Sequence, residues 1–191
     1  MAALAAQAAA AFAGLGAEVE EVARIFDDPT EALWLQGLVG SYSGLGALPA
    51  KKRALLEAEL REGVEAGERV TLKQFLAAGN ARGQLGQTMR LFHGKYDLLL
   101  TPALAVPAFA VGRLKPETMP GPASWTEWTP FTYPFNLSQQ PAASVPCGFT
   151  REGLPVGLQI VGPMHRDDLV LRAARAYEAA HPTTAERPPL Q

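Results

Sequence analysis

Apolar residues recur at helical spacing at the start of the chain. Residues 4–12 follow this spacing, and the pattern stops at Gly14 and Gly16, which are typical of a helix end. Residues 17–22 then alternate at a period of two, which predicts a strand. A helix, a glycine stop and a strand in this order indicate half of a layered α/β unit.

The next part of the chain is predicted to be helical, with one interruption. Asp28 or Thr30 can cap a helix that runs to Leu38, because either side chain can accept a bond from the first free backbone N–H groups. Residues 40–49 hold three Gly and two Ser, which predicts a loop. Residues 50–66 predict a charged amphipathic helix.

A capping pattern introduces a longer helix. Thr71 and Gln74 stand at the spacing of a capping box, and the helix is predicted to run to about His93. It contains three glycines, each of which costs a helix about 1 kcal/mol relative to alanine. These are Gly79, Gly83 and Gly86. The cost suggests close packing against another element, and a broken helix is the alternative.

A short apolar run and a long irregular stretch follow. Residues 96–102 are apolar until Pro102 stops them, which predicts a strand buried on both faces. Residues 102–134 are rich in proline and carry few regular signals. A stretch of this length inside a domain is usually functional, so we expect a pocket wall or lid. It also collects aromatic residues: Phe109, Trp125, Trp128, Phe131 and Tyr133.

Two strand-like runs near the C-terminus predict a β-hairpin. Residues 142–149 and 155–162 are joined by a short connection in which Gly153 can adopt a backbone conformation that other residues disfavour. A Pro-, Asn- and Gln-rich loop is predicted to lead into the hairpin. An amphipathic helix follows from Asp167. The organisation predicted is one domain over residues 1–181 and a flexible tail over 182–191.

Composition narrows the class of protein. The 191 residues are 48% hydrophobic and 19% charged, and the formal charge is −2, so no nucleic-acid partner is expected. The single cysteine excludes an intramolecular disulfide and fits a reducing compartment, which predicts a cytoplasmic protein. The apolar N-terminus lacks the basic start of a signal peptide, and no run is long enough to span a membrane.

The side chains of this sequence supply no evident reactive centre. Cys147 would need a histidine within hydrogen-bond reach to act as a nucleophile, and it is better explained as a small apolar residue. Ser138 and Ser144 lack the glycine-flanked turn that a serine nucleophile usually occupies. The acidic pairs precede helices, where they act as caps. No metal-ligand spacing and no phosphate-binding loop is present, so no metal or cofactor is predicted.

Several motifs nevertheless resemble the C-terminal part of the amidase signature family. They occur in the order of that family over residues 96–102, 134–137, 141–148 and 153–162. The helix–glycine–strand segment at 15–22 and the end of the last helix fit as well, so the resemblance covers nearly the whole chain. It implies an α/β fold with a mixed β-sheet and flanking helices, of which this chain is the C-terminal part only.

The resemblance also implies a reaction whose catalytic groups this sequence does not match. Family members cleave carboxamide C–N bonds, giving a carboxylate and ammonia or an amine, through a Ser–cis-Ser–Lys triad. A neutral lysine in a desolvated site can take the proton of the nucleophile through the bridging serine. No residue here corresponds to the glycine- and serine-rich stretch of that triad. We therefore assign no catalytic residue and expect the chain alone to be inactive.

The family pattern does suggest residues of the substrate pocket. Trp125, Trp128 and Phe131 are candidates for its acyl or amine side, and plain core packing is the alternative. In the A subunits of tRNA-dependent amidotransferases, an acidic residue seven places before the residue matching Asn136 helps to hold glutamine. Thr129 occupies that place here. The difference favours a general amidase acting on an apolar or aryl small-molecule amide.

Three further hypotheses remain from the sequence. The chain could be part of the A subunit of a tRNA-dependent glutamine amidotransferase. It could be a non-enzymatic binding or assembly module, and a homo-oligomer is possible. Finally, it could be a complete hydrolase that uses Cys147 or Ser144, which predicts amide or ester turnover by the chain alone.

Overall fold

The computed structural model describes residues 1–119 and 125–182, apart from the side chain of Trp125. It divides into two units, which are described separately. The first consists of Met1–Ile25 and the chain from Met89 onward, and the second of Phe26–Thr88. The predicted tail over 182–191 lies outside the described residues except for Pro182.

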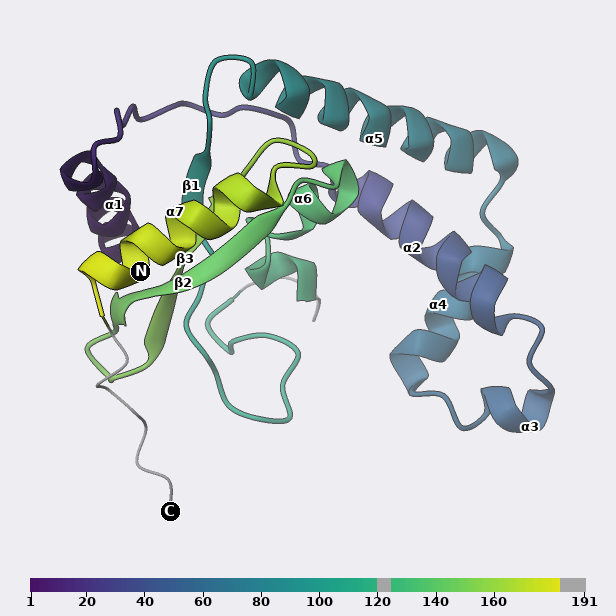
Figure 1. The fold of residues 1–191 in the computed structure, drawn as a ribbon. Helices are drawn as coiled ribbons and strands as arrows, with labels where there is room; N and C mark the ends of the chain where they lie inside the picture. The colour runs from purple at the N-terminus through teal and green to yellow at the C-terminus, as the bar shows by residue number, and fades with distance from the viewer. Residues whose placement is uncertain (120–124, 183–191) are drawn as a thin grey trace. The chain divides into compact units, whose positions relative to one another are not determined.

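The first unit is built on a three-stranded sheet (Figure 1). The strands are β1 (Leu99–Pro102), β2 (Ala142–Phe149) and β3 (Pro155–Val161). Their order is β1-β3-β2, and both described pairings are antiparallel. The predicted strand after Tyr96 and the predicted hairpin are therefore confirmed. Gly153 has φ +79 in the connection, as expected, and its N–H donates to the Thr150 carbonyl at 3.0 Å.

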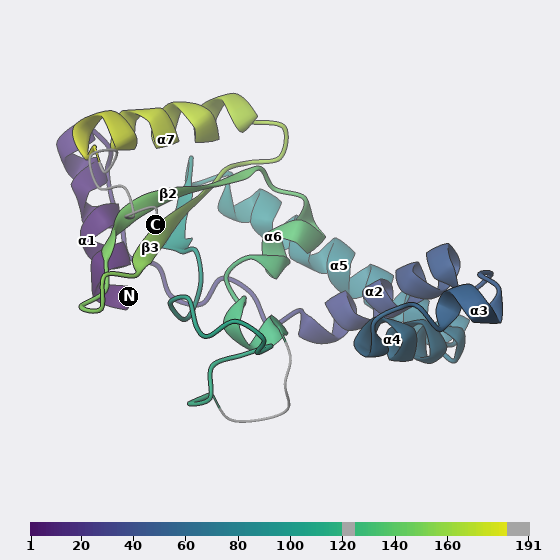
Figure 2. The same ribbon diagram turned by 90° about the horizontal axis from the view of Figure 1, so that it is seen from below.

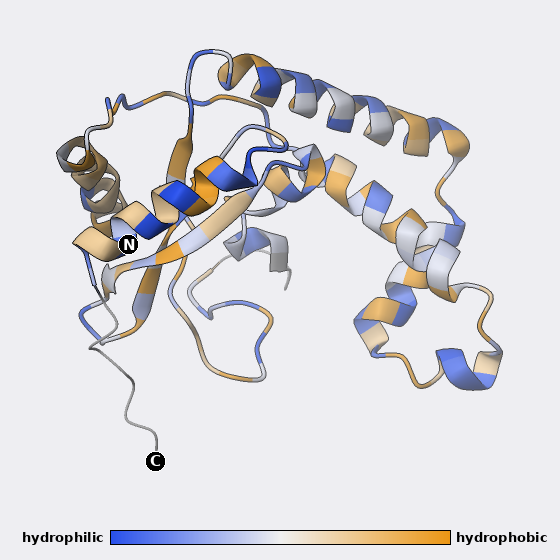
Figure 3. Ribbon diagram, in the orientation of Figure 1, coloured by the Kyte–Doolittle hydropathy of each residue, from blue (hydrophilic) through white to orange (hydrophobic). Residues whose placement is uncertain are grey.

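Helices accompany this sheet, which confirms the α/β class. They are α1 (Ala2–Ala11), the 3-10 helices η1 (Phe12–Leu15) and η2 (Trp125–Trp128), α6 (Tyr133–Ser138) and α7 (Asp167–Ala180). Figure 2 shows α7 running alongside β2 and β3. Hydrophilic and hydrophobic residues are both present along α7 (Figure 3), as expected for a helix with one face on a core.

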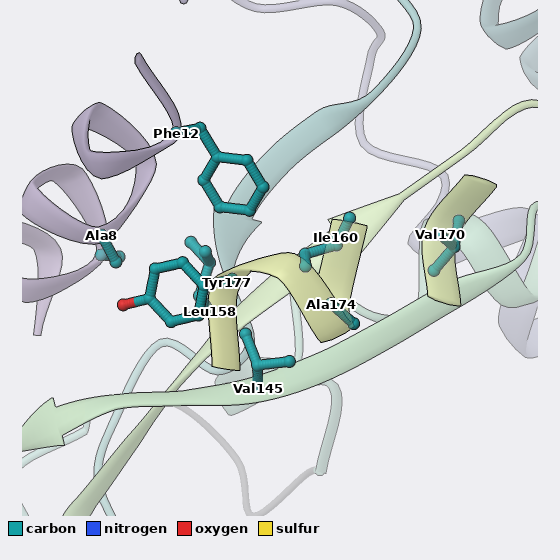
Figure 4. Packing of buried hydrophobic residues seen from close by; sticks show 9 residues of the cluster. Ala8, Phe12, Val145, Leu158, Ile160, Val170, Ala174 and Tyr177 are labelled. Carbon is teal, nitrogen blue, oxygen red and sulfur yellow. The ribbon is translucent and has the colours of Figure 1, made fainter. Parts of the chain in front are cut away.

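The core of the first unit lies between the sheet and the helices α1 and α7 (Figure 4). Leu158 and Ile160 of β3 are fully buried there. Phe12 stacks on Tyr177 with ring centroids 5.4 Å apart, which joins η1 to α7. Since side chains alternate along a strand, the side chain of Gln159 projects to the opposite side of the sheet.

Two predictions for the first unit are wrong. Residues 17–22 form no strand, because a strand needs a paired neighbour and no described strand lies beside this segment. Their side chains are exposed except for half-buried Val22. The predicted loop before β2 contains the helix α6, whose residues Tyr133 and Phe135 are buried. Burial of this apolar face stabilises a short helix that local sequence does not specify.

The second unit contains α2 (Thr30–Leu45), α3 (Ala50–Arg53), α4 (Ala58–Glu68) and the first part of α5 (Leu72–Phe92). The N-cap residue of α2 is Pro29, without a side-chain cap, so neither Asp28 nor Thr30 occupies the predicted cap position. The N–H of Thr30, the first residue of the helix, nevertheless donates to Asp28 Oδ1 at 3.0 Å. The capping box is confirmed: the N–H of Thr71 donates to Gln74 Oε1 at 2.9 Å, and that of Gln74 to Thr71 Oγ1 at 3.3 Å.

Helix boundaries in the second unit differ from the predicted ones. The helix α2 continues beyond Gly40 to Leu45, and the charged segment at 50–66 is divided between α3 and α4. Packing helps to explain the longer α2, since α4 lies directly against it where Gly67 meets the backbone of Leu38. Tertiary contacts of this kind override local helix propensity.

The glycines of α5 lack the close contacts that we expected from their unfavourable helix propensity. A methyl group added at Gly79, Gly83 or Gly86 would meet no atom within 4 Å among the described residues. The helix itself is unbroken over Leu72–Phe92. None of the described helices combines the length and the apolar character required to cross a membrane.

Candidate functional site

A row of polar side chains crosses the face of the sheet that lies opposite the core. In the strand register, Gln159 of β3 stands beside Thr101 of β1 and also beside Ser144 of β2. Residues that are opposite each other in neighbouring strands project to the same side. The three strands therefore contribute two hydroxyls and one amide to a single line of side chains.

Gln159 connects this row to the chain segment that contains the predicted pocket residues. Its side-chain Nε2 donates to Thr101 Oγ1 at 3.0 Å and to the carbonyl oxygen of Phe131 at 2.6 Å. The residue is only 5% exposed. Thr101 in turn donates to the carbonyl oxygen of Pro102 at 3.0 Å. Both N–H groups of the Gln159 amide thus have acceptors, as a buried amide requires.

Trp128 is fixed by contacts at both its side chain and its backbone. Its indole N–H donates to the Leu114 carbonyl at 2.7 Å, and its own carbonyl accepts from the N–H of Ala105 at 3.2 Å. Phe109 meets the indole edge to face, with ring centroids 5.5 Å apart. Trp128 is therefore held by three separate positions within residues 105–114.

The other predicted pocket residues lie in the same chain segment as Trp128. Thr129 is buried, and its carbonyl accepts from both the N–H and the hydroxyl of Thr132 at 3.0 Å. Phe131 is half-buried and held through its carbonyl by Gln159. Trp125 begins η2, but its side chain lies outside the described part of the structure. We call residues 125–132 the pocket wall, a name that states their predicted role; the pocket described next is lined by other residues.

A separate pocket of about 390 Å³ lies between the end of α6 and the start of α7. Of the predicted pocket residues whose side chains are described, none lines it; these are Trp128, Thr129 and Phe131. Its lining includes Gln139 and His165, which have φ values of 63 and 66. These are the two residues other than glycine with positive φ in the described chain. Polar side chains form most of its lining.

The candidate nucleophiles occupy structural positions. Cys147 is half-buried against the core, and burial raises the pKa of its thiol, which favours the unreactive protonated form. Ser138 is buried and bonds to the Pro134 carbonyl at 2.9 Å and to the side chain of Gln140. Ser144 is exposed, and the described residues provide it with no base.

The histidines do not complete a catalytic pair. His93 Nδ1 lies 3.0 Å from the Tyr96 carbonyl, and His181 Nδ1 lies 3.3 Å from the Tyr177 carbonyl. His165 lies in the polar pocket between α6 and α7. Within residues 1–119 and 125–182, no group of three or more His, Cys, Asp or Glu is arranged to hold a metal ion.

His93 gives a pH-dependent prediction. Burial lowers its pKa below the ordinary value of about 6.5, against the smaller opposing effects of the Tyr96 carbonyl and Asp97. Its Nε2 is buried without a hydrogen-bond partner among the described residues. The unfolded chain therefore binds a proton at a higher pH than the folded chain. We expect the free energy of unfolding to fall as pH drops through about 6.5 towards the folded pKa.

The measurement compares urea unfolding of the wild type and His93→Gln between about pH 5 and pH 7. The variant removes the titrating group, so its stability should depend less on pH over this interval. Equal slopes in the two proteins would contradict the assignment of this effect to His93.

Sequence reasoning missed Gln159 and Thr101 as residues near the site. The sequence does show a glutamine within an otherwise apolar strand. A buried glutamine amide needs hydrogen-bond partners, so this residue could have been singled out. Its partners lie 58 and 28 residues away along the chain, so they become visible only when the strands are paired.

Comparison with known proteins relates this chain to amidases. A sequence model of one family, described as Amidase, matches residues 5–171. An acylamidase of Rhodococcus erythropolis is 35% identical over an alignment of 188 residues, and the match covers 95% of this chain and 39% of the acylamidase. The A subunit of the glutamyl-tRNA(Gln) amidotransferase of Myxococcus xanthus (strain DK1622) is 41% identical over 107 residues, which are 56% of this chain and 21% of the Myxococcus protein.

Solved structures show the same relationship in three dimensions. The structure of a 6-aminohexanoate cyclic dimer hydrolase matches with a TM-score of 0.83 and 27% identity. The match covers 98% of this chain and 42% of the hydrolase. The chain therefore spans about two fifths of the length of the acylamidase and of this hydrolase.

Proposed function

The chain belongs to the amidase signature family, and from this membership we propose that it forms the pocket-bearing part of a hydrolase that cleaves carboxamide C–N bonds. The products are a carboxylate and ammonia or an amine. The observation that carries the proposal is the match to the Rhodococcus acylamidase over 95% of the chain. The family match and the structural match to a cyclic amide hydrolase support the same reaction class.

A general amidase is a better proposal than part of an amidotransferase. The matched region of the Myxococcus protein covers 56% of this chain, against 95% for the acylamidase. Thr129 also supports this choice, because a buried neutral hydroxyl offers no negative charge to the ammonium group of glutamine. The expected substrate is an apolar or aryl amide in a cytoplasmic enzyme, and self-association of the chain is compatible with this role.

The pocket wall supplies suitable surfaces for such a substrate. Trp128 and Phe131 present aromatic rings, and Phe109 supports the indole of Trp128. Aromatic surfaces with few polar groups are typical of small-molecule sites. We propose Trp128, Phe131 and Trp125 as contacts for the acyl or aryl part of the amide, with Thr129 beside them.

The catalytic groups are proposed to lie in a part of the amidase fold that this chain does not contain. Cys147, Ser138 and Ser144 lack the geometry of an activated nucleophile. The relatives carry more than half of their length outside the matched region. We therefore expect hydrolysis only when that part is supplied, and no turnover by the 191-residue chain alone.

The experiment combines the chain with the part of the Rhodococcus acylamidase that it does not match. Release of nitroaniline from para-nitroacetanilide, and of ammonia from glutamine, is measured for each part and for the mixture. We expect the mixture to hydrolyse the anilide and each part by itself to show no hydrolysis. Preference for glutamine would favour the amidotransferase alternative, and a mixture that hydrolyses no amide would contradict the amidase proposal. Turnover by the chain alone that is lost in Ser144→Ala or Cys147→Ala would show a complete hydrolase.

A further inference from the structure

We infer that Gln159 is a positioning residue for the substrate pocket, because its side-chain amide fixes the pocket wall against the sheet. The inference deepens the proposed function and rests on it for the identity of the pocket. Gln159 lies at the centre of the polar row, with its side chain buried between β1, β2 and the wall. We assign it no direct contact with substrate.

The hydrogen bonds fix the orientation of the Gln159 amide. The carbonyl oxygen of Phe131 can only accept, so the atom that faces it must be the amide nitrogen. The hydroxyl of Thr101 donates its own proton to the Pro102 carbonyl and is thus available as an acceptor. Both contacts identify the same nitrogen, and the two N–H groups are used in different directions.

These bonds join elements that local structure does not connect. One N–H reaches β1 through Thr101, and the other reaches the wall at Phe131. Trp128, three residues before Phe131, has its carbonyl bonded to Ala105 and its indole to Leu114. Loss of the Gln159 donors leaves the carbonyl of half-buried Phe131 without this partner, which is unfavourable. The wall is then expected to move away from the sheet.

Ordinary core packing does not account for a glutamine at this position. The neighbouring residues Leu158 and Ile160 form the core on the other side of β3, where apolar side chains suffice. A leucine or methionine of similar volume at 159 would fill the space without requiring a partner. The amide contributes directed hydrogen bonds, and one of these goes to Phe131 within the aromatic wall.

The first test uses Gln159→Met, which keeps the approximate length of the side chain and removes both donors. Solvent exchange of the Trp128 indole N–H is measured by NMR in the 191-residue chain, with its resonance assigned through Trp128→Phe. We expect exchange to become roughly tenfold faster, since one buried hydrogen bond is worth about that factor in the open population. The matched control is Ile160→Val, which alters a buried residue of the same strand on the opposite face.

A second variant separates the hydrogen bond from general destabilisation. In Gln159→Glu, an ionised carboxylate cannot donate to the Phe131 carbonyl, but a protonated carboxyl can. We therefore compare the exchange rate of the Trp128 indole N–H in Gln159→Glu with that in the wild type at the same pH. The ratio of the two rates should fall towards one as the pH is lowered. A role in sheet stability alone predicts no such recovery.

The same variants give a kinetic result in the mixture of this chain with the remaining part of the acylamidase. Gln159→Met should raise KM for the anilide about tenfold and change kcat less, whereas Ile160→Val should leave KM unchanged. Equal Trp128 exchange in Gln159→Met and Ile160→Val would overturn the inference. If exchange responds as expected but no mixture hydrolyses an amide, the positioning of the wall stands and the proposed function fails.

Discussion

Replacement of Leu158 by alanine is expected to lower the free energy of unfolding of the first unit by about 3–4 kcal/mol. Leu158 is 0% exposed and belongs to the core between the sheet, α1 and α7. The substitution removes apolar surface and leaves a cavity, because Phe12 and Tyr177 are stacked on each other and cannot both move into the space. The loss is a large part of the roughly 5–15 kcal/mol that stabilises an ordinary domain.

Amide hydrogen exchange along β2 and β3 measures this effect for the first unit separately. The matched control is Leu171→Ala in α7, since the side chain of Leu171 is 64% exposed. The control is expected to change stability by less than about 0.5 kcal/mol. If the two leucine substitutions increased exchange in the hairpin equally, Leu158 would not have a central role in packing.

The second large effect is expected at Gly67, where α4 crosses α2. A methyl group added to Gly67 would lie 2.7 Å from the carbonyl carbon of Leu38 and 2.8 Å from Cβ of Tyr42. Backbone atoms cannot rotate away as a side chain can, so the two helices must separate. We expect Gly67→Ala to destabilise the second unit by about 2–3 kcal/mol, the usual range for overpacking.

The control for this prediction is one turn away on the same helix. A methyl group added to Gly63 would meet Leu38 Cδ2 at 3.8 Å, an ordinary contact distance. Gly63→Ala should therefore stabilise the helix by up to about 1 kcal/mol through its better helix propensity. Hydrogen exchange measured by mass spectrometry over residues 30–68 distinguishes the two outcomes. Stabilisation by Gly67→Ala would disprove the close contact of α2 and α4.

Local signals in the sequence predicted many elements of the fold correctly. The capping box at Thr71 is an interaction within four residues, and the turn at Gly153 depends on one backbone conformation. Such features follow from nearby residues, so they can be read without knowledge of the fold. The order of motifs in residues 96–162 indicated the amidase family, and the family match confirms it.

The wrong predictions concern segments whose secondary structure depends on contacts with a neighbouring element. Residues 17–22 have a strand-like alternation, yet no described strand pairs with them. The glycine-rich start of the predicted loop after residue 40 is helical because α2 packs on α4. The glycines of α5 suggested close packing that the described chain does not contain. Periodicity and composition report what a segment can do, whereas its neighbours determine which possibility is realised.

The amino-acid sequence by itself thus determined the family, the hairpin, the capping box at Thr71 and the segment that contains the aromatic pocket candidates. Only the tertiary structure showed that Gln159 connects that region to Thr101 and to the sheet. The physical reason is distance along the chain. A side-chain amide specifies that it needs acceptors, but which acceptors it finds depends on strand register and on the path of residues 125–132, and both are set by packing over the whole unit.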